Sequence, residues 1–348
     1  MSKSTSVLEQ LFSRFGVGDW GYTEDSKPLT YKHYLDWVDR GDSSPLSYLE
    51  DHRKDLRSDI KKFYPDFQSA LVFLFPYTQA RKELEGIYDL DDSNGLRVAS
   101  YVLGFDGKDY HYEISQRLET MGRELEIYLH EHKFIDPQKK LEWKLSLDLH
   151  PVLDRDLAYR SGLGWFGKNS MLINRKVGSY TIIGSLLLNE KLPPELLPKK
   201  QIDTDHCGQC RACVESCPTD AINSSKRQII ASKCISTFTI ETFKEANPID
   251  GHLQNSQGEI FGCDICQDVC PWNHKPLMRE AVGEHALNEK ELENKVISNF
   301  LKTPLDGLIN KFELMSNKAY VREFFGTPFA RTGRKGMLKN LKVFIPRK

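Results

Sequence analysis

Residues 207–218 read CGQCRACVESCP, and residues 263–271 read CDICQDVCP. The first stretch has the spacing C-x2-C-x2-C-x3-C-P, which is typical of bacterial ferredoxins. Three cysteines at this spacing can hold three corners of one [4Fe–4S] cube, and the fourth lies beyond the turn. In proteins with two such clusters, this fourth cysteine ligates the other cluster. The spacing therefore predicts iron–sulfur chemistry and requires a partner motif.

The second stretch supplies that partner motif, because its last cysteine is also followed by a proline. Val269 stands at the third ligand position, so this loop is one thiolate short. The remaining cysteine of the eight, Cys234, lies between the two motifs and completes the set. We predict one cluster on Cys207, Cys210, Cys213 and Cys270, and the other on Cys263, Cys266, Cys217 and Cys234.

Two other uses of cysteine compete with this prediction. Structural zinc also takes four cysteines, but zinc sites need neither the three-cysteine run nor the reciprocal Cys-Pro pair. Disulfides are the weakest alternative, because cysteines three residues apart in a tight loop are poorly placed to bridge. About 190 residues precede the cysteines, far more than an electron carrier needs. We therefore expect an electron acceptor in the first part of the chain.

The composition narrows the class of protein. The 348 residues suffice for two or three domains, and 39% of them are apolar. Lys plus Arg (48) nearly balances Asp plus Glu (49), so no overall field draws the chain to nucleic acid or membrane. Residues 1–16 show no signal-peptide pattern, and no run of about 18 apolar residues predicts a membrane span. We expect a cytoplasmic protein, where thiols stay reduced.

Hydrophobic periodicity divides the chain into three parts. The apolar run 70–75 (ALVFLF), the alternation at 143–147 and the run 180–188 predict strands, and residues 110–130 predict an amphipathic helix. The first 65 or so residues read as helical. We predict a mixed α/β (α+β) domain over residues 1–195, a small ferredoxin-like domain over 196–280, and a helical, basic region over 281–348.

Two segments of the first part are candidates for function. Asp148 precedes a His-Pro turn at the end of an expected strand, where a closed apolar pocket would raise its pKa toward that of a general acid. Such a residue is more often a local cap. Gly162–Lys168 matches G-x-x-x-x-G-K, but Asn169 replaces Ser or Thr and no strand precedes it. Its glycines indicate instead a close approach of backbone to a large ligand or a neighbouring chain.

Together these segments resemble the epoxyqueuosine reductase family, cobalamin-dependent iron–sulfur enzymes of tRNA queuosine synthesis. The resemblance covers most of the chain, and the combination of motifs is more specific than the cysteines alone. The matching segments are GKDYH at 107–111, D-x-x-P-V-L-D-R at 148–155, GLGWFGKN at 162–169, GSY at 178–180, CGQCRACVESCPTDAI at 207–222, CIS at 234–236, GCDICQDVCPWN at 262–273 and FFGTPFARTGRKGMLKN at 324–340.

The resemblance implies that the first domain binds cobalamin. The two clusters would reduce cob(II)alamin to cob(I)alamin, which would reduce epoxyqueuosine at the wobble position of a tRNA to queuosine. Asp148 matches the family's proposed proton donor, a role worth ~10²–10⁴-fold in rate. The implied cobalamin contacts are Arg57, Asp148, Leu172, Ile183, Ser236, Cys263 and Asp264.

The resemblance also implies partners, namely a tRNA that carries epoxyqueuosine and a low-potential electron donor. We expect a monomer without a membrane anchor. Phosphates could bind the basic run near Phe324 and Phe325, although a solvated helix face is an equally good interpretation. This run comprises Arg331, Arg334, Lys335, Lys339 and Lys342, of which the first three are the predicted tRNA contacts.

Three departures from the family pattern concern the expected pocket. The family usually has a small residue at His150 and an arginine at Ser100, and Phe105–Gly107 is an apparent insertion. Leu153 replaces the glycine of the base-bound signature D-x-H-x-x-G, so we expect cobalamin without a protein imidazole ligand. His150 would contact substrate or lie in the turn, and an axial role stays open. The alternatives are a reductive-dehalogenase-like corrinoid enzyme, a non-catalytic electron-transfer module, and a family member with altered tRNA specificity.

Overall fold

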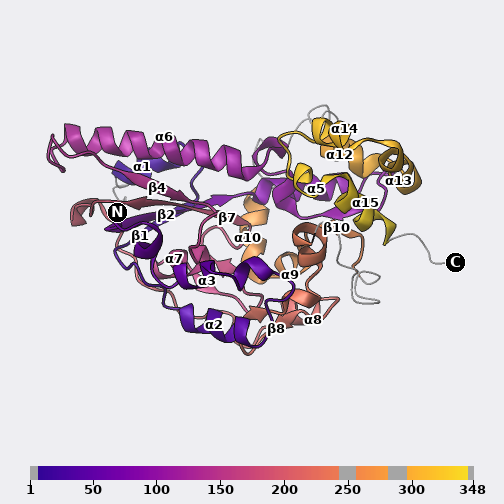
Figure 1. Ribbon diagram of the computed structural model, residues 1–348, viewed down its shortest axis with the longest axis horizontal. Helices are drawn as coiled ribbons and strands as arrows, with labels where there is room; N and C mark the ends of the chain where they lie inside the picture. Colours follow the sequence, from indigo (N-terminus) through magenta and orange to yellow (C-terminus); the bar gives the residue numbers. More distant parts are fainter. Residues whose placement is uncertain (1–6, 243–255, 281–295, 344–348) are drawn as a thin grey trace.

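The computed structural model describes residues 7–242, 256–280 and 296–343. A twisted sheet forms the middle layer of the molecule, with the long helix α6 above it and the cysteine-bearing segment below it (Figure 1). A group of C-terminal helices lies beside these layers at one end (Figure 1). The mixed helix-and-sheet class expected from the sequence is therefore confirmed.

The main sheet has four strands in the order β1-β2-β7-β4, and each neighbouring pair is antiparallel. These strands are β1 (Asp19–Thr23), β2 (Ser69–Pro76), β7 (Thr181–Leu188) and β4 (Trp143–Ser146). The expected strands at 70–75, 143–147 and 180–188 are confirmed. The antiparallel pairing makes the domain α+β in the strict sense, since α/β domains use mainly parallel strands.

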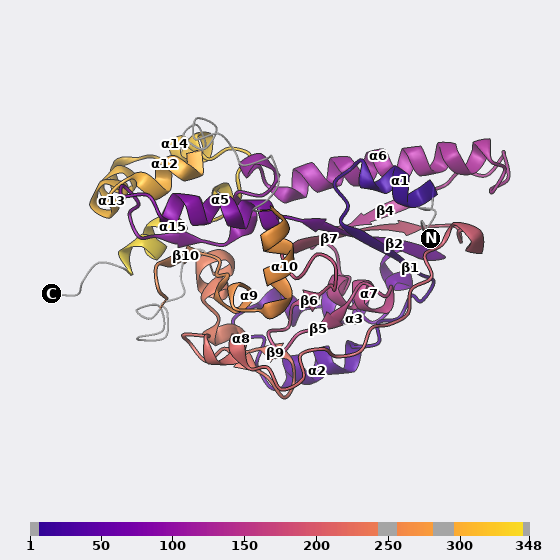
Figure 2. The same cartoon turned by 180° about the vertical axis from the view of Figure 1, so that it is seen from behind.

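The central strand β2 is apolar throughout because helices cover both faces of the sheet. Its residues Leu71, Phe73 and Phe75 pack toward α6 (Tyr110–Glu131) and α1 (Val7–Ser13). The alternate residues Ala70, Val72 and Leu74 pack on the opposite side, toward α7 (Asp154–Arg160) and α4 (Ile60–Phe63). The two helical layers are seen from both sides in Figures 1 and 2. The predicted helix at 110–130 is confirmed.

The expectation that the first 65 residues are helical is wrong at β1, which forms one edge of the sheet. Its Gly21 lies against α7, where a Cβ atom would come within 2.3 Å of the Ser161 carbonyl oxygen. The close packing of this strand thus depends on a residue that itself disfavours strands. The other elements of this part are α2 (Tyr31–Asp39), η1 (Ser47–Leu49), α3 (Arg53–Leu56), α5 (Thr78–Tyr88), β3 (Arg97–Val98), η2 (Ser100–Val102), η3 (Phe105–Gly107), β5 (Trp165–Phe166), β6 (Leu172–Ile173) and η4 (Pro194–Leu196).

The cysteine-bearing segment consists of short elements. They are α8 (Ala212–Glu215), β8 (Ile222–Asn223), β9 (Gln228–Ile229), η5 (Ala231–Lys233), the π-helical turn η6 (Thr237–Glu241), β10 (Glu259–Phe261), α9 (Ile265–Asp268) and α10 (Pro271–Glu280). Strand β10 pairs in parallel with β3, which joins this segment to the first part of the chain.

The C-terminal elements are α12 (Val296–Lys302), α13 (Leu305–Leu314), α14 (Asn317–Glu323), η8 (Pro328–Arg331) and α15 (Gly333–Lys342). They share one hydrophobic core with α5 and β10, so the packing crosses both predicted domain boundaries, which themselves stay a prediction. None of the helices in the described ranges is long and apolar enough to cross a membrane.

Candidate functional site

The first set of cysteines gathers around the loop before α8. Burial raises the pKa of the Cys270 thiol to about 11, and the neighbouring thiols of Cys207, Cys213 and Cys210 add to this shift. Burial also raises the pKa of Cys213, again with Cys207 and Cys210 as neighbours. Mutual electrostatic effects of this kind require proximity. The structure thus brings together the four cysteines predicted for one cluster.

The second set gathers around the loop before α9. Burial raises the pKa of Cys266, with further contributions from the neighbouring Cys234, Asp264, Cys213 and Cys217. Burial raises the pKa of Cys234 as well, and Cys217 is again a neighbour. The last member is Cys263, whose pKa is raised by burial and then by Glu259, with Cys266 and Cys234 also contributing. All eight cysteines are free thiols, and ligation of the clusters stays a prediction.

The glycine-rich segment supports the first set. Lys168 Nζ donates hydrogen bonds to the carbonyl oxygens of Gly208 and Cys210, and the donor–acceptor distance is 2.7 Å in both. Gly164, with φ 145°, lies so close to the next strand that a Cβ would come within 2.1 Å of the Ile173 carbonyl oxygen. The backbone at these glycines therefore approaches a neighbouring segment of the same chain, which is one of the two predicted alternatives.

Trp165 completes the surroundings of the first set. Its ring packs against Cys207 and Cys270, and its buried indole Nε1 has no hydrogen-bond partner among the described residues. A buried N–H without a partner is costly. Cluster sulfurs accept hydrogen bonds, so an iron–sulfur cluster at this place would satisfy the donor. The residues present therefore fit the predicted cluster.

A buried hydrogen-bond network holds the cysteine-bearing segment against the sheet. The side-chain oxygen of Asn273 accepts a hydrogen bond from the Ser179 backbone N–H over 2.7 Å. Asp268 accepts hydrogen bonds from the Tyr180 hydroxyl and, over 2.5 Å, from Arg81 Nε. The GSY motif at 178–180 thus positions the clusters relative to the first domain.

A second constellation surrounds Asp148, and we call Tyr48, Arg57, Tyr110, Asp148 and Glu241 the Asp148 group. The Tyr110 hydroxyl donates a hydrogen bond to Asp148 Oδ2 over 3.1 Å, and the Tyr48 hydroxyl donates one to Glu241 Oε2 over 3.3 Å. Burial raises the pKa of Tyr48, with Glu241 and Asp148 as the charged neighbours, and Arg57 opposes the shift. The group joins residues that are far apart in the sequence.

Asp148 itself lies beyond the end of β4 and not in the strand as expected, because β4 ends at Ser146. Its backbone adopts φ 60°, and its side chain is exposed instead of lying in a closed apolar pocket. Tyr110 is the first residue of α6, whose N-cap Asp109 accepts a hydrogen bond from the His111 backbone N–H. Burial and then the Asp148 charge raise the pKa of Tyr110, so its phenol keeps the proton that it donates.

The guanidinium of Arg57 offers a free donor within the Asp148 group, where Arg57 and Asp148 both influence the pKa of Tyr48. The residue is only 8% exposed, and its buried Nη1 has no partner in the described part of the chain. Its guanidinium carbon lies 5.9 Å from the centroid of the Tyr34 ring. An orphaned guanidinium N–H is costly unless a ligand oxygen accepts it. Together with the exposed carboxylate of Asp148, this describes a place prepared for a polar ligand.

The other predicted cofactor contacts come from the sheet region and from the cysteine-bearing segment. Leu172 and Ile183 belong to the same hydrophobic cluster on the α7 side of the sheet. Ser236 is half-buried and is the N-cap of the π-helical turn. Asp264 is buried and accepts hydrogen bonds from the backbone N–H and the hydroxyl of Ser100 over 2.6 and 2.5 Å. Burial raises the pKa of Asp264 to about 6.

The departures from the family pattern have local structural consequences. Ser100 is completely buried, so its side chain holds Asp264 and does not face a substrate. His150 lies in the turn, and its ring packs edge-on against Phe63 at 4.9 Å between centroids. The insertion Phe105–Gly107 has positive φ at all three residues, and Arg117 lies over the Phe105 ring at 5.4 Å. The axial role left open for His150 stays untested.

The predicted basic run does not form one continuous surface. Lys339 Nζ donates hydrogen bonds inward to the carbonyl oxygens of Phe238 and Thr242, at the π-helical turn. Arg334 Nη1 donates to the Phe312 carbonyl oxygen over 2.8 Å. Lys335 is exposed, and so is Arg331, which lies close enough to Tyr110 and Glu241 to influence their pKa values. Arg331 therefore extends the Asp148 group.

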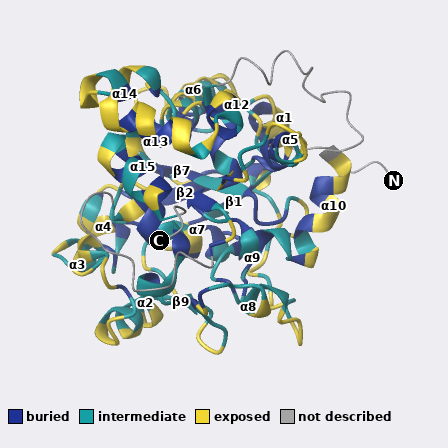
Figure 3. Ribbon diagram, turned by 90° about the vertical axis from the view of Figure 1, so that its right-hand side faces the viewer, coloured by how far each residue is buried: buried dark blue, intermediate teal, exposed yellow. Residues whose placement is uncertain are grey.

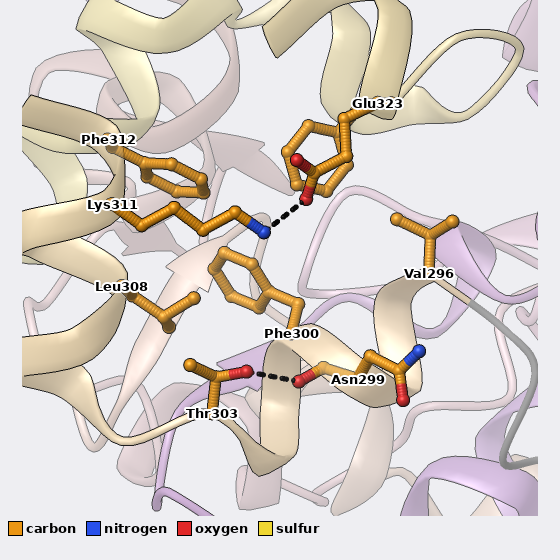
Figure 4. A pocket seen from close by; sticks show the side chains of 9 residues that line it. Val296, Asn299, Phe300, Thr303, Leu308, Lys311, Phe312 and Glu323 are labelled. Carbon is orange, nitrogen blue, oxygen red and sulfur yellow. Dashed lines mark hydrogen bonds and ion pairs between the residues drawn. The ribbon is translucent and has the colours of Figure 1, made fainter. Parts of the chain in front are cut away.

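A pocket of about 260 Å³ lies elsewhere, between α12, α13 and α14. The rings of Phe300 and Phe312 form its wall, and the ion pair of Lys311 with Glu323 crosses it over 2.7 Å (Figure 4). None of its lining residues is a cysteine or a member of the Asp148 group. The pocket is a gap in the helical packing.

Sequence reasoning missed Tyr48 and Glu241, which are 193 residues apart and meet only in the folded chain. It also missed Asp154 and Arg155 as parts of an ionisable cluster, although both stand in the matched segment. The Arg155 guanidinium is exposed and donates a hydrogen bond from Nη1 to the Ser170 carbonyl oxygen at 2.6 Å.

Asp154 predicts a measurable pH dependence. Burial and the Asp148 charge raise its pKa from 3.8 to about 7, although the Ser146 hydroxyl donates a hydrogen bond to it. The folded protein therefore binds this proton more tightly than the unfolded chain, and the resulting stability is lost as the pH rises from about 4 to about 7. In urea unfolding, wild type should lose up to roughly 4 kcal/mol relative to Asp154→Asn over this range, since one pKa unit corresponds to about 1.4 kcal/mol. The exposed-site variant Asp91→Asn should run parallel to wild type; parallel curves for Asp154→Asn would contradict the shift.

Comparisons with known proteins agree with the cysteine pattern and with the family resemblance. A family model described as a 4Fe-4S double cluster binding domain matches residues 206–273, so the chain carries such a domain. A second model, described as Epoxyqueuosine reductase QueG, DUF1730, matches residues 57–138. The first matched range contains all eight cysteines, which makes structural zinc the poorer interpretation.

Whole-chain relatives extend this agreement. Epoxyqueuosine reductase from Cyclobacterium marinum is 33% identical over 339 residues, covering 92% of this chain and 99% of the relative. That from Pseudomonas aeruginosa is 30% identical over 336 residues, covering 95% and 81%. The structure of the Streptococcus thermophilus epoxyqueuosine reductase shares the fold, with a TM-score of 0.72 at 21% identity over 96% of this chain and 78% of that one. An epoxyqueuosine reductase crystallised with an epoxyqueuosine-modified tRNA-Tyr stem loop gives a TM-score of 0.70 at 22% identity, with the same coverage. From its whole-length identity to these relatives, the chain belongs to the epoxyqueuosine reductase family.

Proposed function

We propose that this protein reduces epoxyqueuosine to queuosine at the wobble position of a tRNA. The observation that carries the proposal is the conjunction of a double-cluster domain with an exposed carboxylate, Asp148, held by the Tyr110 phenol. The clusters would receive electrons one at a time from a low-potential donor. The Asp148 group would receive the modified nucleoside. The protein would act as a monomer.

A corrinoid fits the residues beside Asp148. The orphaned Nη1 of Arg57 can donate to amide oxygens such as those at the edge of a corrin ring. Ile183 is partly exposed and packs against the cluster that contains the buried Leu172, while Ser236, Cys263 and Asp264 belong to the segment that carries the second cysteine set. When bound there, a corrinoid supplies a strongly reducing, nucleophilic metal centre fed by the clusters.

The protein's own residues would manage the proton. Removal of an epoxide oxygen as water consumes two electrons and two protons. Protonation of the departing oxygen by Asp148 lets it leave without charge, which is general acid catalysis. Tyr110 positions the carboxyl group, because its retained proton is directed at Asp148 Oδ2.

The predicted tRNA contacts divide between two roles. Arg331 lies beside the Asp148 group and would meet a phosphate near the modified nucleotide. Arg334 and Lys335 lie on α15, where Lys335 is the more exposed of the two. Membership of the family disfavours a reductive dehalogenase or a non-catalytic electron-transfer module, since the matched relatives are named for epoxyqueuosine reduction.

The test is a single-turnover assay of the protein after anaerobic reconstitution with iron, sulfide and cobalamin. A chemical low-potential reductant replaces the unknown donor, and the substrate is an anticodon stem loop that carries epoxyqueuosine. Mass spectrometry of the digested RNA should show conversion to queuosine, with loss of one oxygen atom. Protein reconstituted without cobalamin is the matched control. Equal conversion with and without cobalamin, or none with fully loaded protein, would refute the proposal.

A further inference from the structure

The outer face of α14 (Asn317–Glu323) combines exposed apolar side chains with basic ones. Phe325, two residues beyond the helix, is 82% exposed, and Val321 beside it is 47% exposed. Asn317, Lys318 and Arg322 complete the lining of this shallow surface, to which no carboxylate contributes. Figure 3 shows the exposed outer side of α14 at the edge of the molecule. We call these five residues the α14 face.

The α14 face is rigidly held although it is exposed. The inward residues Tyr320 and Phe324 are buried, and the Tyr320 hydroxyl donates a hydrogen bond to the Phe329 carbonyl oxygen over 3.1 Å. Phe325 therefore projects from the end of an anchored helix. The ring is thus held on a fixed backbone in contact with solvent, where a partner can reach it.

A short chain of contacts links this face to Asp148. The residue after Phe325 is Gly326, whose carbonyl oxygen accepts a hydrogen bond from the Asp109 backbone N–H over 2.7 Å. Asp109 is the N-cap of α6, and the next residue, Tyr110, donates to Asp148 Oδ2. The exposed ring is thus anchored next to the residues that would act on the modified nucleotide.

The chemistry of the face matches single-stranded RNA. An exposed aromatic ring offers a stacking platform for any base, and flanking cations bind the backbone phosphates. Lys318 and Arg322 are both exposed. The acidic residue nearest in the helix, Glu323, is turned away and paired with Lys311.

We propose that the α14 face binds the single-stranded nucleotides of the RNA substrate that flank the modified one, with Phe325 stacked on one base and Arg322 and Lys318 on phosphates. The inference rests on the proposed function, since it takes the substrate to be RNA. It assigns part of the substrate binding to a surface that is separate from the basic run at residues 331–342. Binding there would fix the neighbouring nucleotides while the modified base reaches Asp148.

The experiment measures binding of a fluorescently labelled anticodon stem loop to the iron–sulfur-loaded full chain by anisotropy. Phe325→Ala should weaken binding by about 5- to 150-fold, because stacking on an aromatic side chain is worth about 1–3 kcal/mol per base. Phe325→Trp keeps an aromatic ring at this position and should bind the RNA as wild type does. Ile127→Ala removes an exposed apolar side chain from the middle of α6 and should leave binding unchanged. Arg322→Gln should reduce the salt dependence by about one phosphate contact.

A second readout distinguishes stacking on Phe325 from non-specific binding of the RNA. 2-Aminopurine is placed in turn on either side of the modified nucleotide, and wild type should quench its fluorescence at one of these positions. Phe325→Ala should abolish that quenching. If wild type binds and converts the RNA but Phe325→Ala matches Ile127→Ala in affinity and quenching, the α14 face is excluded and the proposed function stands. If wild type neither binds nor converts the RNA, both proposals fall.

Discussion

Replacement of Cys217 by alanine will remove the same cluster as replacement of Cys263, although the two cysteines stand in different motifs. Cys217 lies close enough to Cys234 and Cys266 to raise the pKa of both thiols. The thiol of Cys270 is influenced instead by Cys207, Cys213 and Cys210. The double variant Cys217→Ala/Cys263→Ala should therefore keep about half of the iron, with one intact cluster. Cys217→Ala/Cys207→Ala should lose nearly all of it.

Iron and sulfide analysis of anaerobically purified protein measures this difference directly. If each motif held its own cluster, the two double variants would exchange their results, and the reciprocal arrangement would be wrong. Ser232→Ala, next to the second set but without a thiol, is the control and should keep the full iron content. Loss of either cluster should also lower the unfolding temperature, because metal–thiolate bonds contribute folding energy to small modules of this kind.

Asp148→Asn should lower the single-turnover rate by about 10²–10⁴-fold, the usual value of a positioned general acid. The amide has the same shape, and its oxygen can still accept the Tyr110 hydrogen bond, so the clusters and the fold should be unaffected. What the variant loses is the proton that departs with the oxygen. The rate is measured with the reconstituted protein and the epoxyqueuosine stem loop.

Two observations decide whether that loss is specific. Asp136→Asn removes an exposed carboxylate before β4 and should react as wild type does. The absorption spectra of the clusters and of bound cobalamin should be the same in all three proteins. A rate for Asp148→Asn within about twofold of wild type would show that the proton comes from elsewhere, with the Tyr110 phenol as the next candidate.

Much of the fold was predictable because the signals are local. The continuous apolar run of β2 and the three-to-four-residue period of α6 each follow from the face that the element buries. The strand β1 was not predictable in this way. Its five residues, DWGYT, contain a glycine that the strand needs only because Ser161 lies against it. A requirement imposed by a distant neighbour leaves no local pattern.

The sequence by itself determined the chemistry of this protein: eight cysteines, seven of them in two Cys-Pro motifs, an aspartate before a turn, and glycines where backbone approaches something closely. The two cysteine sets could be predicted from these motifs, but only the tertiary structure decided which residues surround Asp148. Tyr48 reaches Glu241, and Tyr110 reaches Asp148, across 193 and 38 residues. It also turned Lys339 inward, exposed Phe325 and buried Ser100. Residue types and short spacings can be read directly from the sequence. Proximity between distant segments arises from packing, which no short stretch of the sequence specifies.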